Sequence, residues 1–273
     1  LGAGATVVRA APQAEQSGYV AIDGSDVSAT VGIPRRQPLP HVFVVELPAA
    51  TRFTRFEVAP IDEFGSARGR HVKNVTIEGS DTSPDDGFTP LVAFTLRPGI
   101  EGPQSFAVPA PRPVRWVRVS FLDTFEPASA DFQPHRFSDL RGYGTQPTVE
   151  VAGDAFTGRW RLRRMGLNDA PGLNLYELWQ DGTTITGCQR MGGAQSTITG
   201  TLTGGLARLI AENDQGQRTP FIARIASDRQ LVGVTFSGPP RAFYAAPAPD
   251  AEAPCRPPPT PGNPISDALQ AGK

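Results

Sequence analysis

The chain has 273 residues, of which 39% are hydrophobic, and its 26 lysines and arginines nearly balance its 27 aspartates and glutamates. A net charge of −1 gives no electrostatic reason to bind nucleic acid or anionic lipid, so neither is an expected partner. No apolar run reaches the roughly 20 residues that a membrane-spanning helix needs. The 29 glycines and 28 prolines favour an all-β protein with many turns, and the length allows two domains.

We expect residues 1–16 to form an N-terminal extension and residues 17–147 to form a β-sandwich. Period-two alternation in "VRWVRVSF" places Val117, Val119 and Phe121 on one face of a strand. Seven short strands separated by turn clusters are typical of a sandwich. The expected strands are His41–Leu47, Thr51–Pro60, His71–Gly79, Leu91–Leu96, Gln104–Val108, Val114–Leu122 and Arg136–Tyr143.

The order of these segments resembles the discoidin, or coagulation-factor type C, family of galactose-binding-like jelly rolls. "HVFVVELPAATRFTRFEV" is similar to the first core strand pair of that family, and "KNVTIEGSDT" to its strand that ends in Ser/Gly-Asp. "RPVRWVRVSF" resembles its aromatic-x-Arg strand and "FSDLRGYG" its closing strand. The resemblance implies a jelly-roll β-sandwich over about residues 17–145. The sequence lacks the early tryptophan that is usual in this family and the family's paired terminal cysteines.

Galactose-binding-like domains often hold a structural calcium ion near an early Asp-Gly, and "AIDGSD" occupies a comparable place. Carboxylate oxygens on a tight loop suit calcium, so Asp23 and Asp26 are the candidate ligands, with a plain turn as the alternative. We expect no other cofactor.

Exposed aromatic rings stack on sugar rings while polar neighbours bind the hydroxyls. Phenylalanines in loops also serve as plugs over the end of a sandwich, so both roles stay open. The candidate ligand-binding residues are Phe64, Arg68, Arg70, Phe88, Phe125, Phe132 and Arg136.

Catalytic signatures are missing from the sequence. It contains no Gly-x-Ser-x-Gly elbow, Walker loop or dinucleotide fingerprint, and its three histidines lie far from metal-ligand spacing. A glycoside hydrolase needs only two facing carboxyl groups, and Asp81, Asp85 and Asp86 form the densest acidic cluster. Because "SDTSPDDG" is also ordinary turn chemistry, we expect a turn there, with calcium binding as the alternative, and no enzyme.

We expect residues 148–246 to form a small antiparallel meander barrel of eight strands with tight links. Asp181-Gly182 is a strong hairpin signal, because both central positions of a type I′ turn need positive φ. Gly158-x-Trp160 resembles the opening of lipocalin-like and avidin-like barrels, in which the tryptophan plugs one end. The expected strands are Phe156–Arg164, Leu173–Gln180, Thr183–Arg190, Ser196–Thr203, Leu206–Glu212, Arg218–Ala226, Leu231–Phe236 and Arg241–Tyr244.

The barrel interior can be filled or can hold one small ligand. Enough large side chains are present to fill it, and a small-molecule carrier is the alternative. The residues expected inside are Trp160, Tyr176, Trp179, Leu202, Leu209, Phe221, Ile225 and Phe236.

Residues 247–273 form a proline-rich tail that cannot bury a core. Its last residues, "PISDALQAGK", resemble the entry to an OmpA-like peptidoglycan-binding domain, which implies a further C-terminal domain. A start at Leu1 fits an exported protein whose signal peptide has been removed, and equally a cloning boundary.

Only two cysteines are present, Cys188 in the barrel and Cys255 in the tail. In an exported chain two cysteines most simply pair, and closing this loop stabilises the fold by on the order of 4 kcal/mol in the chain-entropy model. We therefore expect a disulfide that pins the start of the tail to the barrel, with two free thiols as the alternative.

Together these features predict a non-catalytic module of a bacterial cell envelope, in the periplasm or at the outer membrane. Its expected partner is a glycan or another envelope component.

Overall fold

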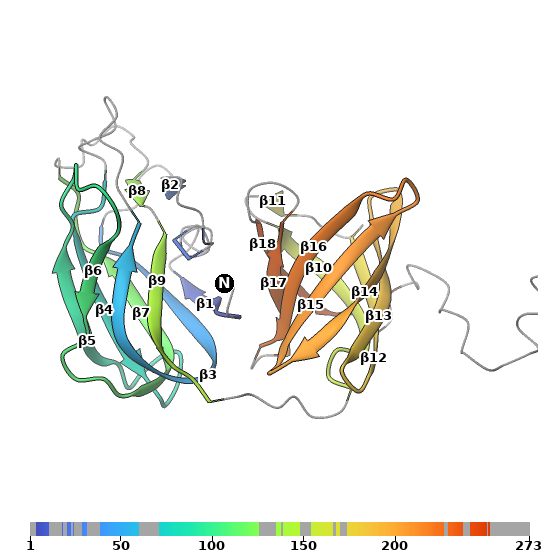
Figure 1. The fold of residues 1–273 in the computed structure, drawn as a ribbon, viewed down its shortest axis with the longest axis horizontal. Coiled ribbons are helices and arrows are strands. Elements are labelled where there is room, and N and C mark those ends of the chain that lie inside the picture. The colour runs from blue at the N-terminus through green and yellow to red at the C-terminus, as the bar shows by residue number, and fades with distance from the viewer. Residues whose placement is uncertain are drawn as a thin grey trace, which may run out of the picture.

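The structure is a computed structural model that describes residues 4–10, 18, 21–22, 24, 29–31, 39–59, 71–125, 135–137, 139–147, 154–165, 168–169, 174–226, 229–236, 241–249 and 251. The regular elements of these ranges are β-strands, arranged as a sandwich followed by a closed barrel (Figure 1). Within the same ranges, no helix is long and apolar enough to cross a membrane. The all-β prediction is therefore confirmed.

The sandwich has a five-strand layer, in the order β1-β3-β7-β4-β5, and a short layer in which β6 and β9 flank the second half of β3. A separate pair is formed by β2 and β8. Its strands are β1 (Thr6–Ala10), β2 (Ala29–Val31), β3 (His41–Val58), β4 (Asn74–Ser80), β5 (Thr89–Thr95), β6 (Gln104–Ala107), β7 (Pro113–Phe121), β8 (His135–Phe137) and β9 (Leu140–Thr145).

Strand β3 belongs to both layers, where the sequence predicted two separate strands. It runs for 18 residues, and its ladder with β7 is irregular only between Glu46 and Thr51. Pro48 lies in this interval. Proline cannot donate to a ladder, but its backbone accepts an extended conformation, so the strand bends there and continues into the other layer.

One further expectation about strands was wrong. The single strand expected over Arg136–Tyr143 is divided between β8 and β9, which pair with different partners, and Asp139 lies between them. The expected N-terminal extension contributes β1, which pairs with β3 as an edge strand of the five-strand layer.

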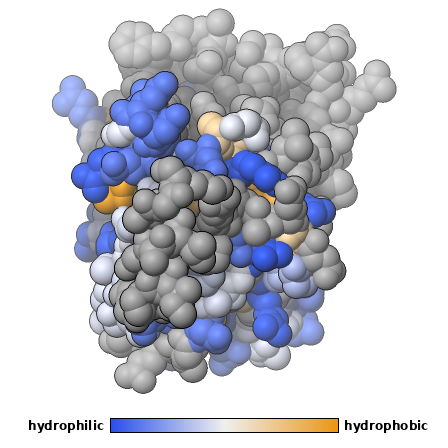
Figure 2. All heavy atoms as spheres, turned by 90° about the vertical axis from the view of Figure 1, so that its right-hand side faces the viewer, coloured by the Kyte–Doolittle hydropathy of each residue, from blue (hydrophilic) through white to orange (hydrophobic). Residues whose placement is uncertain are grey.

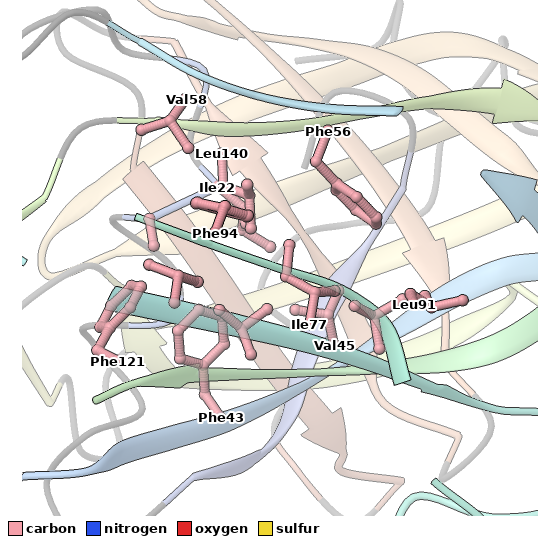
Figure 3. Close-up of a cluster of buried hydrophobic side chains, with 14 of the residues drawn as sticks. Ile22, Phe43, Val45, Phe56, Val58, Ile77, Leu91, Phe94, Phe121 and Leu140 are labelled. Carbon is pink, nitrogen blue, oxygen red and sulfur yellow. The ribbon is translucent and has the colours of Figure 1, made fainter. Parts of the chain in front are cut away.

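The sandwich core lies between the two layers. Val117, Val119 and Phe121 point into it as the alternation predicted, with exposed fractions of 4%, 1% and 0%. Phe121 packs against Phe43 and Phe137, with ring centroids 5.5 and 4.5 Å away. Figure 3 shows part of this cluster, including Phe43, Val45, Ile77, Leu91 and Phe121.

The barrel closes because its first long strand, β10, pairs with both β12 and the last strand, β18. The eight expected strands correspond to β10 and β12 to β18, and β11 is a two-residue addition beside β10. Its strands are β10 (Gly158–Met165), β11 (Asn168–Asp169), β12 (Leu175–Asp181), β13 (Thr184–Met191), β14 (Ala194–Thr203), β15 (Leu206–Asn213), β16 (Arg218–Ile225), β17 (Leu231–Thr235) and β18 (Arg241–Pro247).

The turn between β12 and β13 is shifted by one residue from the expectation. Asp181 pairs with Thr184, so the two turn residues are Gly182 and Thr183, and Gly182 has a φ of 57°. Glycine at the first of two turn positions is typical of a type II′ hairpin. The hairpin was predicted correctly, but its turn type was not.

Side chains occupy the barrel interior. Tyr176, Phe221 and Phe243 form an aromatic group with centroids 5.8 to 6.2 Å apart, and burial raises the pKa of Tyr176. Of the residues expected inside, Trp179 is half-buried outside this cluster and Phe236 is 39% exposed. The other six belong to the cluster or pack against it: Trp160, Tyr176, Leu202, Leu209, Phe221 and Ile225.

The side of the barrel that faces away from the sandwich is mainly hydrophilic where its residues are described (Figure 2). Threonines 197, 199, 201 and 203 project from β14 and are exposed. On the opposite side of the barrel, β16, β17 and β18 are the strands that lie nearest the sandwich (Figure 1).

We expect Phe121→Ala to lower the free energy of unfolding of the sandwich by about 3 to 5 kcal/mol, because it empties a fully buried position between two aromatic rings. The adjacent Leu122→Ala serves as the control, since Leu122 is 40% exposed and its truncation should cost less than about 0.5 kcal/mol. Denaturant unfolding measures both, and equal effects would contradict the described core.

Candidate functional site

Most of the predicted ligand-binding residues lie outside the described part of the chain. This holds for the candidate calcium ligands Asp23 and Asp26 and for the loop residues Phe64, Arg68, Arg70 and Phe132. Arg136 lies in β8, but its side chain is outside the description. The calcium site and the loop site remain predictions. Phe88 and Phe125 are the two candidates that the structure places.

The structure does not bring Phe88 and Phe125 together. Phe125 donates its backbone N–H to the carbonyl of His71, close to the start of β4, whereas Phe88 follows the turn at the other end of β4. A seven-residue strand is about 20 Å long. The two rings therefore cannot contact the same sugar residue.

Phe88 has a structural partner. The guanidinium of Arg118 lies 4.4 Å from the ring centroid, and its Nε donates to Glu78 Oε2 at 2.7 Å. The hydrogen bond to Glu78 raises the pKa of Arg118. The Phe88 ring is half-buried, and the guanidinium of Arg118, a residue of β7, covers one of its faces.

The acidic cluster is an exposed turn. Ser80 Oγ donates to the carbonyl of Asp86 at 2.8 Å, and Ser83 Oγ accepts the backbone N–H groups of Asp85 and Asp86 at 3.2 and 3.0 Å. Asp81, Asp85 and Asp86 are all exposed. Among the described residues no cluster of histidine, cysteine or acidic side chains could hold a metal ion. The turn interpretation is confirmed. The acidic residues on which the hydrolase alternative depended therefore lie in an exposed turn.

A cleft of about 410 Å³ opens between the two layers of the sandwich. Its volume is within the range of pockets that hold small ligands. Val45, Leu47, Val117 and Val119 supply the wall from the five-strand layer. The wall from the short layer contains the rings of Phe53 and Phe56 and the side chain of Leu140. The floor of the cleft is therefore apolar.

Strand β9 approaches the ring of Phe53 closely in this wall of the cleft. A Cβ atom at Gly142 would lie 2.4 Å from Cε1 of Phe53, so only glycine allows β9 to approach that ring. Next to it, Tyr143 stacks under the guanidinium of Arg55, whose Cζ is 4.0 Å from the ring centroid. Close backbone approach on one side and ring stacking on the other fix the edge of the cleft.

Polar groups gather at the mouth of the cleft around Asp139. This side chain is 2% exposed, and its Oδ1 accepts the backbone N–H of Gly24 at 2.9 Å. Its Oδ2 accepts Nε of Arg141 at 2.7 Å. Gln146 also lines the mouth, and its Nε2 donates to the carbonyl of Ala49 at 3.3 Å. Asp139 thus holds Arg141 in place beside an apolar surface.

This arrangement is suited to binding. A guanidinium and an amide bind hydroxyl oxygens, and the neighbouring aliphatic and aromatic groups pack against C–H surfaces. Asp139 is the only carboxylate among the described residues that line the cleft, and it is already paired. Hydrolysis of a glycosidic bond normally uses two carboxyl groups, which the described lining does not provide.

The sequence contained a signal for this site that was interpreted only as a strand. "FSDLRGYG" places Asp139, Arg141 and Tyr143 alternately with Leu140, Gly142 and Gly144, so one face of the strand is polar and the other is small or apolar. Glycines on the core side of an edge strand mark close approach of another group. The contribution of Val45 and Leu47 depends on the packing of two layers and has no local signal.

Comparisons with known proteins gave structural neighbours for part of the chain. No protein-family model and no curated protein matches the sequence. A CBM32 module of a family 31 glycoside hydrolase from Clostridium perfringens has 17% identity and a TM-score of 0.39, covering 52% of this chain and 91% of its own. The family 32 carbohydrate-binding module of Streptococcus pneumoniae EndoD has 14% identity and a TM-score of 0.40, covering 52% and 97%.

A third neighbour, from Clostridium perfringens, was solved in complex with GalNAc-β-1,3-galactose; it has 14% identity and a TM-score of 0.37, covering 51% of this chain and 94% of its own. Identities of this size do not assign a function, which has to come from the residues of the cleft.

The pairing of Asp85 with Arg9 can be tested through the pKa of the Asp85 carboxyl group. Its hydrogen bonds with Arg9, at 2.8 and 3.1 Å, lower the pKa of the carboxyl group below its ordinary value of 3.8. The pair is therefore present above about pH 4 and is lost as pH falls through the lower, folded-state pKa. We expect Arg9→Gln to return the pKa to about 3.8, measured by NMR titration of the carboxyl carbon. Arg9→Lys, which keeps the charge, should return it only in part, and an unchanged pKa in Arg9→Gln would contradict the pairing.

Proposed function

We propose that the protein is a non-catalytic glycan-binding module whose cleft between the sandwich layers holds a sugar residue. The observation that carries this proposal is the juxtaposition of the Asp139–Arg141 pair and Gln146 with the apolar wall formed by Phe53, Phe56 and Leu47. A pyranose presents the same two surfaces, a C–H face and a rim of hydroxyls.

The buried carboxylate supports the proposal through positioning. An arginine whose Nε is held by a carboxylate keeps its other N–H groups in a fixed plane, which reduces the side-chain entropy lost on binding. Only 36% of the Arg141 side chain is exposed. Preorganised donors at a half-buried site favour recognition of a defined hydroxyl pattern over loose association with any polar surface.

The barrel offers less support for the alternative of a small-molecule carrier. Its interior contains a cluster of buried side chains that includes the aromatic group of Tyr176, Phe221 and Phe243. A carrier would need apolar space that a ligand can enter. The cleft in the sandwich is the better candidate for a ligand.

We further propose that the module is exported and acts in the cell envelope, in the periplasm or at the outer membrane, with an OmpA-like domain after the tail. This part rests on the proline-rich composition of residues 247–273, on the resemblance of their end to the entry of such a domain, and on the expected disulfide.

The path of the chain after β18 supports a disulfide between Cys188 and Cys255. Arg159 holds this segment by its carbonyl, which accepts N–H of Ala248 at 2.8 Å, and by Nη1, which donates to the carbonyl of Ala251 at 2.7 Å. The same arginine pairs with Glu177, which lies opposite Cys188 in the ladder of β12 and β13.

Cys188 is 3% exposed, and no cysteine in the described part of the chain is free. Cys255 lies outside that part, so the pairing stays a prediction. From Ala251, four further residues span up to about 14 Å, and two strand spacings from β10 to β13 amount to about 10 Å. The tail is therefore long enough to reach Cys188.

Arg141→Ala should weaken glycan binding by at least about tenfold, because it removes a charged hydrogen-bond donor from the mouth of the cleft. A glycan array that includes GalNAc-β-1,3-galactose identifies the ligand, and calorimetry measures the affinity. Arg97→Ala is the control, since Arg97 is an exposed arginine outside the cleft. The proposal is wrong if no glycan on the array binds, or if Arg141→Ala and Arg97→Ala bind equally well.

Intact mass spectrometry of alkylated protein, with and without reductant, tests the disulfide. We expect no alkylation before reduction and two alkylated cysteines after it. Cys188→Ser with Cys255→Ser should lower the free energy of unfolding of the barrel by about 2 to 4 kcal/mol. Alkylation of Cys188 without reductant would show that the pair does not form and would weaken the case for export.

A further inference from the structure

Arg224 is a barrel residue that is buried outside the barrel. Phe221 and Ala223 of β16 belong to the interior cluster, so Arg224 projects from the outer face of the strand. Nevertheless only 4% of its side chain is exposed. An arginine on the outer face of a barrel is normally solvated, so another part of the molecule has to cover it.

The sandwich provides that cover. Nη1 of Arg224 lies 3.3 Å from Glu46 Oε1, Nη2 donates to the carbonyl of Glu46 at 3.2 Å, and Nε donates to the carbonyl of Gly4. Only 1% of the Glu46 side chain is exposed, and its Oε1 also accepts Nη2 of Arg115 at 3.1 Å. Residues 178 positions apart in the sequence thus form a buried ion pair between the two domains.

The residues that receive Arg224 adjoin the wall of the cleft. Gly4 and Glu46 precede Ala5 and Leu47, which line the cleft. A Cβ atom at Gly4 would lie 2.9 Å from Cγ of Pro48, another lining residue, 3.1 Å from Cδ of Arg224 and 3.4 Å from Cδ1 of Leu206. At this point the wall of the cleft is packed directly against β15 and β16 of the barrel.

We infer that Arg224 is a positioning residue for the cleft: by binding Glu46 and the carbonyl of Gly4, the barrel fixes the wall formed by Ala5, Leu47 and Pro48. A buried carboxylate tolerates the loss of a partner poorly, so removing Arg224 frees this wall even though Arg224 does not line the cleft. The effect on ligand affinity rests on the proposed function, whereas the effect on the wall does not.

Full-length Arg224→Met tests the inference by hydrogen exchange and by calorimetry. We expect peptides that cover residues 4–10 and 43–50 to exchange about tenfold faster or more, because the wall opens locally. Peptides from β12 to β14 should be unchanged, and the affinity for the glycan found on the array should fall about tenfold or more. Arg218→Met is the matched control, because Arg218 lies on the same strand and pairs with Glu212 at 3.4 Å while remaining 60% exposed.

Arg224→Lys keeps the charge but has fewer donors, so it should give intermediate exchange and affinity. It decides the question if Arg224→Met does not fold. If residues 4–10 and 43–50 exchange in Arg224→Met at the same rate as in Arg218→Met, the inference is overturned. Faster wall exchange with unchanged glycan affinity would overturn the link to the cleft while leaving glycan binding intact. If the wild-type protein binds no glycan, the proposed function fails, and the exchange of the wall alone decides whether Arg224 positions it.

Discussion

The buried carboxylate of Glu46 lies where three parts of the structure meet: the bend of β3, the neighbouring strand of the sandwich and the outer face of the barrel. It stands at the bend of β3, just before the strand passes from the five-strand layer into the short layer. Arg115 binds it from within the sandwich and Arg224 from the barrel. Only 1% of the Glu46 side chain is exposed, and a carboxylate buried to this extent is stable only when its partners are in place. The bend, the end of the sandwich and the outer face of the barrel are therefore fixed together, directly beside the cleft.

The bend of β3 also creates the cleft. Because one strand contributes Val45 and Leu47 to one wall and Phe53 and Phe56 to the other, its curvature sets the separation of the walls. Side chains fill most of the space between the layers, but the core side of β9 carries Gly142 and Gly144. The space that remains lies between apolar groups, and polar groups are confined to its mouth. Under the proposed function, a few fixed donors set selectivity for the ligand, and the apolar wall supplies contact area.

The sequence predicted the barrel better than the sandwich, for a physical reason. Barrel strands follow one another through tight turns, so alternation and glycine positions define each strand locally, and Asp181-Gly182 located a hairpin to within one residue. In the sandwich, β3 pairs with strands from across the domain, and the extension contributed β1. The residues of the cleft come from both layers. The pair between Glu46 and Arg224 has no local signature, because its partners belong to different domains and lie 178 positions apart in the sequence.

Side chains fill the interior of the barrel, and the barrel contacts the sandwich through the outer face of β16. Its core gives β16 a fixed position, and β16 presents Arg224 to the sandwich. Ala5, Leu47 and Pro48 line the cleft beside this contact. Under the proposed function, ligand binding and domain docking therefore depend on the same short segments. Linkage then requires reciprocity: if docking of the barrel strengthens ligand binding, the bound ligand strengthens docking by the same free energy. If Arg224 positions the wall of the cleft as inferred, this one arginine of the barrel influences recognition by the sandwich without contacting the ligand.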